Sequence, residues 1–150
     1  MSIKIITVLD SISALSVSGV TVKDINEVDE GWQVRGAVLY PLIDNLVIFS
    51  KPTRQSFGIG SAKRLDINYA LSYRLLYAPV GSGRGAKDVF TGLTTTIAAI
   101  LDALNVLDAP SGAVDIEASI NDGKPVVKDP AGNDYWGCDF TINVLEFNEV

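Results

Sequence analysis

Residues 64–77 read RLDINYALSYRLLY, and apolar side chains occupy nearly every second position of this stretch. Because successive side chains of a strand point to opposite faces, the alternation predicts one long strand with an apolar face. The leucine and tyrosine side chains of that face need a cover, either from helices or from a neighbouring subunit. The other face carries Arg64, Asp66 and Arg74, which we expect to look outward.

One helix is predicted before this strand in the sequence, and another is predicted after it. Before it, apolar residues at steps of three and four predict an amphipathic helix with Ser2 as its cap and Gly19 at its end. After it, the same period predicts a helix that opens after the glycine loop Gly81–Gly85 and stops near Asp108. The two apolar stripes are Ile5, Val8, Leu9, Ile12 and Leu15, and Phe90, Leu93, Ile97, Ile100, Leu101 and Leu104.

The segment between the first helix and the long strand predicts short strands and connections. Residues 24–30 are rich in acid and predict an exposed connection. Residues 34–50 are apolar and β-branched but contain Pro41, which fits two short strands or one bent edge strand. Residues 51–62 contain proline and glycine without clear periodicity, so we expect a long mobile loop or arm there.

The C-terminal part predicts two further strands. Residues 114–120 and 136–144 alternate in the same way, and turn sequences lie between them at 121–123 and 129–133. We therefore expect these two strands to be antiparallel neighbours. No repeat or linker divides the chain, which predicts a single α+β domain over residues 1–150. Its sheet is expected to be mixed and mainly antiparallel, with the two main helices packed on it.

The composition bounds the function. The chain has 150 residues, of which 47% are hydrophobic and 20% charged, so part of the apolar surplus is expected in subunit contacts. No apolar run approaches the ~18 residues of a membrane span, and residues 1–18 lack signal-peptide features, so we expect a soluble protein made in a cytoplasm. The chain has no histidine, and its single cysteine, Cys138, excludes an internal disulfide. This pattern predicts a protein that is not an enzyme and needs no cofactor or metal.

Two weak motifs have simpler structural explanations. Residues 81–86 match the loose fingerprint G-x-G-x-x-A, which would make the chain a small nucleotide-dependent enzyme. The alternating strand before this loop argues against a dinucleotide fold, as does the placement of Asp102 inside the second helix. Oxygen ligands for calcium are present in the C-terminal part, but their spacing fails the EF-hand pattern and turn residues explain them better. These residues are Asp115, Glu117, Asp122, Asp129, Asn133 and Asp134.

Charge is distributed unevenly along the chain. Residues 51–87 hold seven basic residues and one acid, a net charge of +6, and the remainder of the chain carries −12. We expect these basic residues to form a subunit or partner interface that meets the acidic surface of the next subunit. A solvated face and a nucleic-acid site are the alternatives, although no motif for sequence-specific nucleic-acid binding is present. The residues are Lys51, Arg54, Lys63, Arg64, Arg74, Arg84 and Lys87.

The layout resembles a family of structural proteins. The order of elements, together with the segment 35–41 (RGAVLYP), the strand through Tyr69, Tyr73 and Tyr77, and the loop 81–85, resembles the tail terminator or tail completion proteins of long-tailed bacteriophages. The resemblance implies a ring, commonly of six subunits, at the head-proximal end of the tail in the virion. Such a ring stops polymerisation of the tail tube, and its partners are the tail tube protein and the head–tail connector protein. A head completion or connector protein, or a tail tube protein, of the same particle is the alternative.

Overall fold

The computed structural model describes residues 3–24, 36–56, 61–81, 83, 85–107 and 114–149, with only the backbone described at 49–56, 61–65, 114, 148 and 149. The fold is α+β, with two α-helices and a mixed, mainly antiparallel seven-stranded sheet, as the sequence predicts. The elements in chain order are α1 (Ile5–Ser13), β1 (Val20–Val22), β2 (Ala37–Pro41), the 3-10 helix η2 (Ile43–Asn45), β3 (Val47–Ser56), β4 (Ser61–Pro79), α2 (Ala86–Asn105), β5 (Val114–Ile120), β6 (Val126–Lys128) and β7 (Asp134–Glu149).

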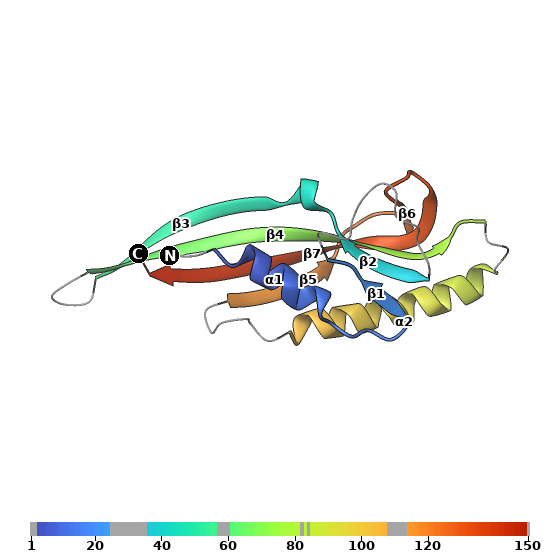
Figure 1. Cartoon of the computed structure of the whole chain (residues 1–150), viewed down its shortest axis with the longest axis horizontal. Helices are drawn as coiled ribbons and strands as arrows, with labels where there is room; N and C mark the ends of the chain where they lie inside the picture. Colours follow the sequence, from blue (N-terminus) through green and yellow to red (C-terminus); the bar gives the residue numbers. More distant parts are fainter. Residues whose placement is uncertain are drawn as a thin grey trace.

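The sheet is organised around β4, the strand that the alternating stretch predicts (Figure 1). Along one side β4 pairs with β7, and along the other it pairs first with β3 and then with β2. The far side of β7 pairs with β5 and with the short β6. The described pairs are antiparallel except β1 with β2. The predicted antiparallel pairing of residues 114–120 with the C-terminal strand is therefore confirmed.

Both α-helices cover the same face of the sheet, which encloses the core (Figure 1). On β4, every second residue from Ile67 to Leu75 belongs to this core, and Tyr69 and Tyr73 are each 1% exposed. The helices contribute apolar stripes of the predicted period, and the buried members are Val8, Leu9 and Ile12 of α1 and Val89, Leu93, Ile100 and Leu104 of α2. Full burial of one such side chain contributes about 1.5–3 kcal/mol. We use the name outer face for the face of the sheet that points away from the helices.

A β-bulge divides β4 near its C-terminal end. The register with β7 shifts between Leu76 and Ala78, so that Tyr77 is the extra residue. The ring of Tyr77 lies against α2, where a Cβ on Gly92 would lie 1.8 Å from the tyrosine hydroxyl. Across the sheet, a Cβ on Gly137 would lie 1.8 Å from the carbonyl oxygen of Leu75. The backbones of β4 and β7 can therefore approach closely at Gly137, because glycine has no side chain.

The start of α1 is fixed to the sheet by a buried carboxylate. Glu146 on β7 is 0% exposed, and its Oε1 accepts the backbone N–H of Lys4 at 2.7 Å and the hydroxyl of Tyr69 at 2.6 Å. The expectation of Ser2 as the cap is wrong, because α1 begins at Ile5 and Lys4 occupies the N-cap position without a side-chain hydrogen bond. The helix ends at Ser13, before Gly19, whose φ of +76° instead forms the turn into β1, a backbone conformation that favours glycine.

The prediction of a loop at residues 51–62 is wrong for the part that the structure describes. β3 continues to Ser56 and β4 begins at Ser61, in a ladder that runs from Val47 opposite Ala70 to Ser56 opposite Ser61. Among the described residues β3 pairs with β4 alone, and an edge strand of this kind is where a sheet tolerates proline such as Pro52. Residues 57–60 and the acidic connection at 25–30 lie outside the described residues.

Candidate functional site

The structure distributes the predicted basic interface over three places. Lys51 and Arg54 lie on β3, and Lys63 and Arg64 lie at the start of β4, so these four share one hairpin. Arg74 lies ten residues further along β4, about 33 Å from Arg64 at ~3.3 Å per residue. Lys87 is exposed in the first turn of α2, and Arg84 lies outside the described residues.

Arg74 does not present a free charge to a partner, because it is paired with Asp139 of its own chain. Its Nε donates to Oδ1 of Asp139 at 2.7 Å, and its Nη2 donates to Oδ2 of the same carboxylate at 2.9 Å. Its Nη1 donates to the carbonyl oxygen of Lys128 at 3.1 Å. Both side chains of the pair are 24% exposed, and the hydrogen bonds with Asp139 raise the pKa of Arg74. The alternation assigned Arg74 correctly to the outer face, but its neighbour on β7 neutralises it.

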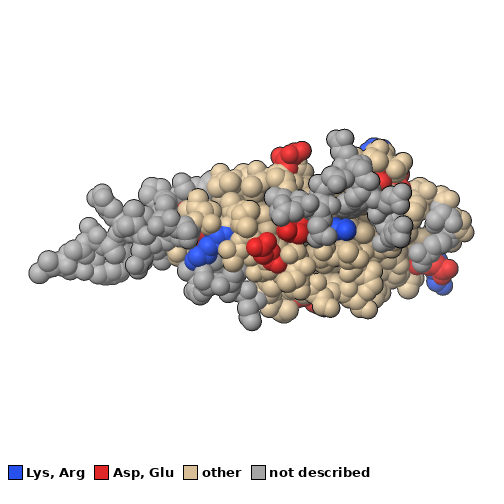
Figure 2. Space-filling model, viewed as in Figure 1, with Lys and Arg blue, Asp and Glu red and all other residues tan. Residues whose placement is uncertain are grey.

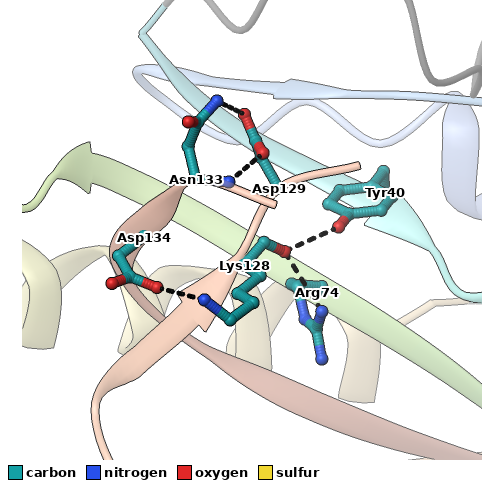
Figure 3. Close-up of polar contacts among 6 residues, drawn as sticks. All are labelled: Tyr40, Arg74, Lys128, Asp129, Asn133 and Asp134. Atoms are coloured by element: carbon teal, nitrogen blue, oxygen red, sulfur yellow. Dashed lines mark hydrogen bonds and ion pairs between the residues drawn. The ribbon is translucent and has the colours of Figure 1, made fainter. Parts of the chain in front are cut away.

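In the same region, several of the acids considered as calcium ligands form hydrogen bonds or ion pairs within the chain (Figure 3). Asp129 accepts the backbone N–H of Asn133 at 2.7 Å and its side-chain amide at 3.2 Å, which closes the turn between β6 and β7. Asp134 pairs with Lys128 at 2.9 Å, and the carbonyl of Lys128 also accepts the hydroxyl of Tyr40. Within the described ranges, no three acidic or cysteine side chains gather in a way that could hold a metal ion.

We expect a measurable coupling between Arg74 and Asp139. Two parallel charge-assisted hydrogen bonds in a half-buried position are stronger than an exposed ion pair. A double-mutant cycle with Arg74→Ala and Asp139→Ala, followed by urea unfolding, should give a coupling free energy on the order of 1–2 kcal/mol. The exposed pair Lys128 and Asp134 is the matched control, for which the same cycle should give less than about 0.5 kcal/mol. Additive effects of the two Arg74–Asp139 mutations would show that the pair contributes nothing.

No described α-helix lies over the outer face of the sheet, which holds a shallow hollow of about 370 Å³. Asp115 and Glu117 of β5 are exposed beside this hollow, and Asn68, Asn143 and Leu145 complete its lining on the same face. No described side chain forms an ion pair with either carboxylate. The outer face also contains small or polar residues, among them Ala70, Ser72, Ser119 and Thr141, and the apolar Phe147.

A second, larger groove of about 670 Å³ lies between α2 and the segment 120–128. Leu93 and Ile97 form its helix side, and Cys138 contributes to its floor. Burial, and to a lesser extent the charge of Asp139, raises the pKa of Cys138 to about 12. The thiol is therefore protonated at neutral pH and packs against the core, in the structural role that the alternation predicts.

This protonation has a direct test. Iodoacetamide at pH 8 should alkylate Cys138 in the folded protein at least about a hundredfold more slowly than it alkylates a small free thiol, because alkylation needs the thiolate. In denaturant the two rates should become equal. Rapid labelling of the folded protein, without unfolding, would show that the groove exposes a reactive thiol.

The glycine loop does not have the surroundings of a nucleotide cradle. The strand that precedes it, β4, is antiparallel to each of its described neighbours, whereas a dinucleotide fold places this loop after a parallel strand. Gly81 and Gly83 have φ values of +83° and +82°, which turn the chain toward α2. The loop is therefore explained as a tight connection between strand and helix.

Glu146 and Asp139 make structural hydrogen bonds, but the sequence does not single them out as candidates. Glu146 follows Phe140, Ile142 and Val144 at the same two-residue spacing, so the pattern that predicts the strand also assigns this acid to the covered face. An acid on an apolar face is the signal that could have identified it. Asp139 has no comparable signal, because its pairing with Arg74 depends on the register of β4 with β7.

Comparison of the sequence with protein-family models and with curated proteins gives no match. Within the described ranges, no helix has the length and apolar character needed to cross a membrane. The surfaces that remain as functional candidates are the basic hairpin of β3 and β4, the outer face of the sheet and the groove beside α2.

Proposed function

We propose that this chain is a structural subunit that assembles with copies of itself into a ring, in the manner of the phage tail terminators that its sequence resembles. In this proposal the ring caps the tail tube at the head-proximal end of the virion tail, stops its polymerisation and offers a surface to the head–tail connector. The observation that carries the proposal is a basic hairpin on an acidic molecule. Figure 1 shows this hairpin extending beyond the rest of the sheet.

The charges of the hairpin are opposite to those of the rest of the chain. We call residues 51–56 of β3 and 61–65 of β4 the arm; it contains Lys51, Arg54, Lys63 and Arg64 and no acid. The arm therefore carries +4, and the rest of the chain carries −10 within the net charge of −6. Two different surfaces of one molecule that complement each other give a head-to-tail contact, which closes into a ring when the rotation permits.

Open sheet edges and exposed apolar side chains supply further contact area. Among the described strands, β3 pairs only with β4, and β5 pairs only with β7, so the sheet ends in two edges that can meet other chains. Val47 and Ile48, just before the arm, are 56% and 53% exposed. Ile6 of α1 is 59% exposed. In the view of Figure 2 most of the described surface is uncharged, which suits a subunit that buries much of it.

Because the fold is rich in strands, a tail tube protein is a second candidate for the function of this chain. Both proteins of such a particle would form rings, but a tube protein would stack its rings into long filaments. A connector or head completion protein would form a ring that docks to the head instead. A structural role of any of these kinds is preferred to a nucleotide-dependent enzyme, because the glycine loop follows an antiparallel strand.

Sedimentation velocity over a range of protein concentration and salt tests the proposal. We expect one discrete oligomer, at least a trimer, that weakens as salt screens the contact between arm and body. A strict monomer at low and high salt, at millimolar concentration, would contradict self-association.

A nucleic-acid function predicts a different result in a simple titration. If the arm binds DNA, fluorescence anisotropy of a labelled duplex should rise with protein concentration, with an affinity that falls steeply as salt increases. We expect no such binding at physiological salt, since the arm is attached to a molecule with a strong negative charge.

A further inference from the structure

We propose that the arm of one copy of this chain covers the outer face of the sheet in the next copy. The inference rests on the proposed self-association and identifies the two surfaces that meet. The arm is one half of the contact, and the outer face around Asp115, Glu117, Asn143 and Leu145 is the other half.

Near its tip the arm pairs with no third strand among the described residues. The pairing of β4 with β7 begins at Arg64 opposite Glu149, so Arg54 to Ser56 and Ser61 to Lys63 pair only with each other among the described residues. An isolated two-stranded hairpin is marginally stable in water. The arm therefore gains order when another surface supports it.

The register of the arm also favours an acidic partner. Arg54 lies directly opposite Lys63, so two positive charges occupy facing positions of the ladder. Like charges in opposite positions destabilise a pair of strands, and a carboxylate from another molecule removes that cost. Within the arm no acid is present to do so.

The outer face has matching properties. No described α-helix lies over it, and it exposes Asp115 and Glu117 two residues apart on β5, without a cation partner among the described side chains. Leu145 and the 36% exposed Phe147 add apolar area to the same face. Among the described residues this face therefore combines exposed polar and apolar side chains with negative charge that no cation balances, which fits a basic β-hairpin as its partner.

The contact is intermolecular because of where the two halves lie. The row of the sheet that contains Asp115 also contains Leu145 and Asn68, which is four residues from Arg64 along β4. In the ladder the arm continues beyond Arg64 on the side away from this row, and to reach the row within one chain the ladder of β3 and β4 would have to break. A contact from arm to face is therefore made between copies, and each copy contributes both halves.

Two charge-reversal variants test the inference. The face variant carries Asp115→Lys and Glu117→Lys, and the arm variant carries Arg54→Glu and Lys63→Glu. Like charges then oppose each other at the contact, so each variant alone should assemble with a dissociation constant raised about a hundredfold. An equimolar mixture of the two should regain assembly, because the reversed face meets the reversed arm and the unchanged face meets the unchanged arm. The mixed oligomer should contain the two chains in equal numbers by native mass spectrometry.

A matched control separates this contact from net charge. The variant with Asp10→Lys and Asp102→Lys changes the charge by the same amount as the face variant, but at exposed positions of α1 and α2, on the covered side of the sheet. It should assemble like the unchanged protein. Circular dichroism checks that every variant is folded, and restoration in the mixture shows the same independently.

The outcomes distinguish the inference from the function on which it rests. Assembly of the unchanged protein together with normal assembly of the face or arm variant would overturn the inference and leave self-association intact. Loss of assembly in both variants without restoration in the mixture would also overturn it. An unchanged protein that never assembles would contradict the proposed function, and the inference with it.

Discussion

Gly137→Ala should strongly destabilise the protein, although it adds only one methyl group. The new Cβ would lie 1.8 Å from the carbonyl oxygen of Leu75 and 2.9 Å from its carbonyl carbon, and both are backbone atoms of the central strand. Unlike a side chain, this backbone has no rotamer that relieves the clash, so β4 and β7 must separate where they pair. We expect a loss on the order of 3 kcal/mol in the free energy of unfolding, measured by urea denaturation.

Gly123→Ala is the matched control for this substitution. Gly123 lies in the connection between β5 and β6, where an added Cβ would meet no atom within 4 Å, and its φ is outside the left-handed region. The same methyl group there should change the free energy of unfolding by less than about 0.5 kcal/mol. Equal effects of the two substitutions would show that the close approach at Gly137 does not exist in the folded protein.

Glu146→Ala should have the second large effect. The substitution removes the acceptor for the N–H of Lys4 and for the hydroxyl of Tyr69, and both donors then lack this partner at the junction of α1 with the sheet. A buried donor without its acceptor costs about 1–3 kcal/mol, so the total loss should be on the order of 3 kcal/mol. Thermal and urea unfolding followed by far-ultraviolet circular dichroism would measure it.

Two further variants test whether the loss of stability comes from the hydrogen bonds of the Glu146 carboxylate. Tyr69→Phe removes one donor together with its need for a partner, and should cost about 1 kcal/mol. Glu117→Ala removes an exposed carboxylate on a neighbouring strand and should leave the free energy of unfolding unchanged within about 0.5 kcal/mol. A Glu146→Ala protein as stable as the Glu117→Ala protein would contradict the role of Glu146 as an anchor of α1.

The parts of the fold that follow from periodicity were predictable from the sequence. The strand around Tyr69 and Tyr73 has a spacing of two, and the stripe with Leu93 and Ile100 has a spacing of three to four, and these local patterns fix which face is buried. The prediction of a loop at residues 51–56 is wrong because Pro52 and the polar residues interrupt the pattern. On an edge strand whose outer side has no described partner, both are tolerated.

The sequence predicts which residues belong to the candidate site, but it does not predict how they are arranged. The sequence identifies the seven basic residues, but membership of the arm depends on β3 and β4 forming a hairpin, and the neutralisation of Arg74 depends on the register with Asp139. Pairings between residues far apart in the chain are set by the whole sheet, and a local pattern does not contain them. For this reason Arg74→Glu, which an exposed position would tolerate, is expected to destabilise the subunit by placing a carboxylate beside Asp139.

Electron microscopy of the purified, unchanged protein in negative stain tests the central proposal most directly. We expect closed rings of uniform size, with rotational symmetry and a central opening, that do not stack into long tubes. Long filaments would favour the tail tube alternative over a terminator. Fields that contain only single subunits or two-fold dimers, in samples applied from the most concentrated protein solution, would contradict the proposal that this chain builds a ring.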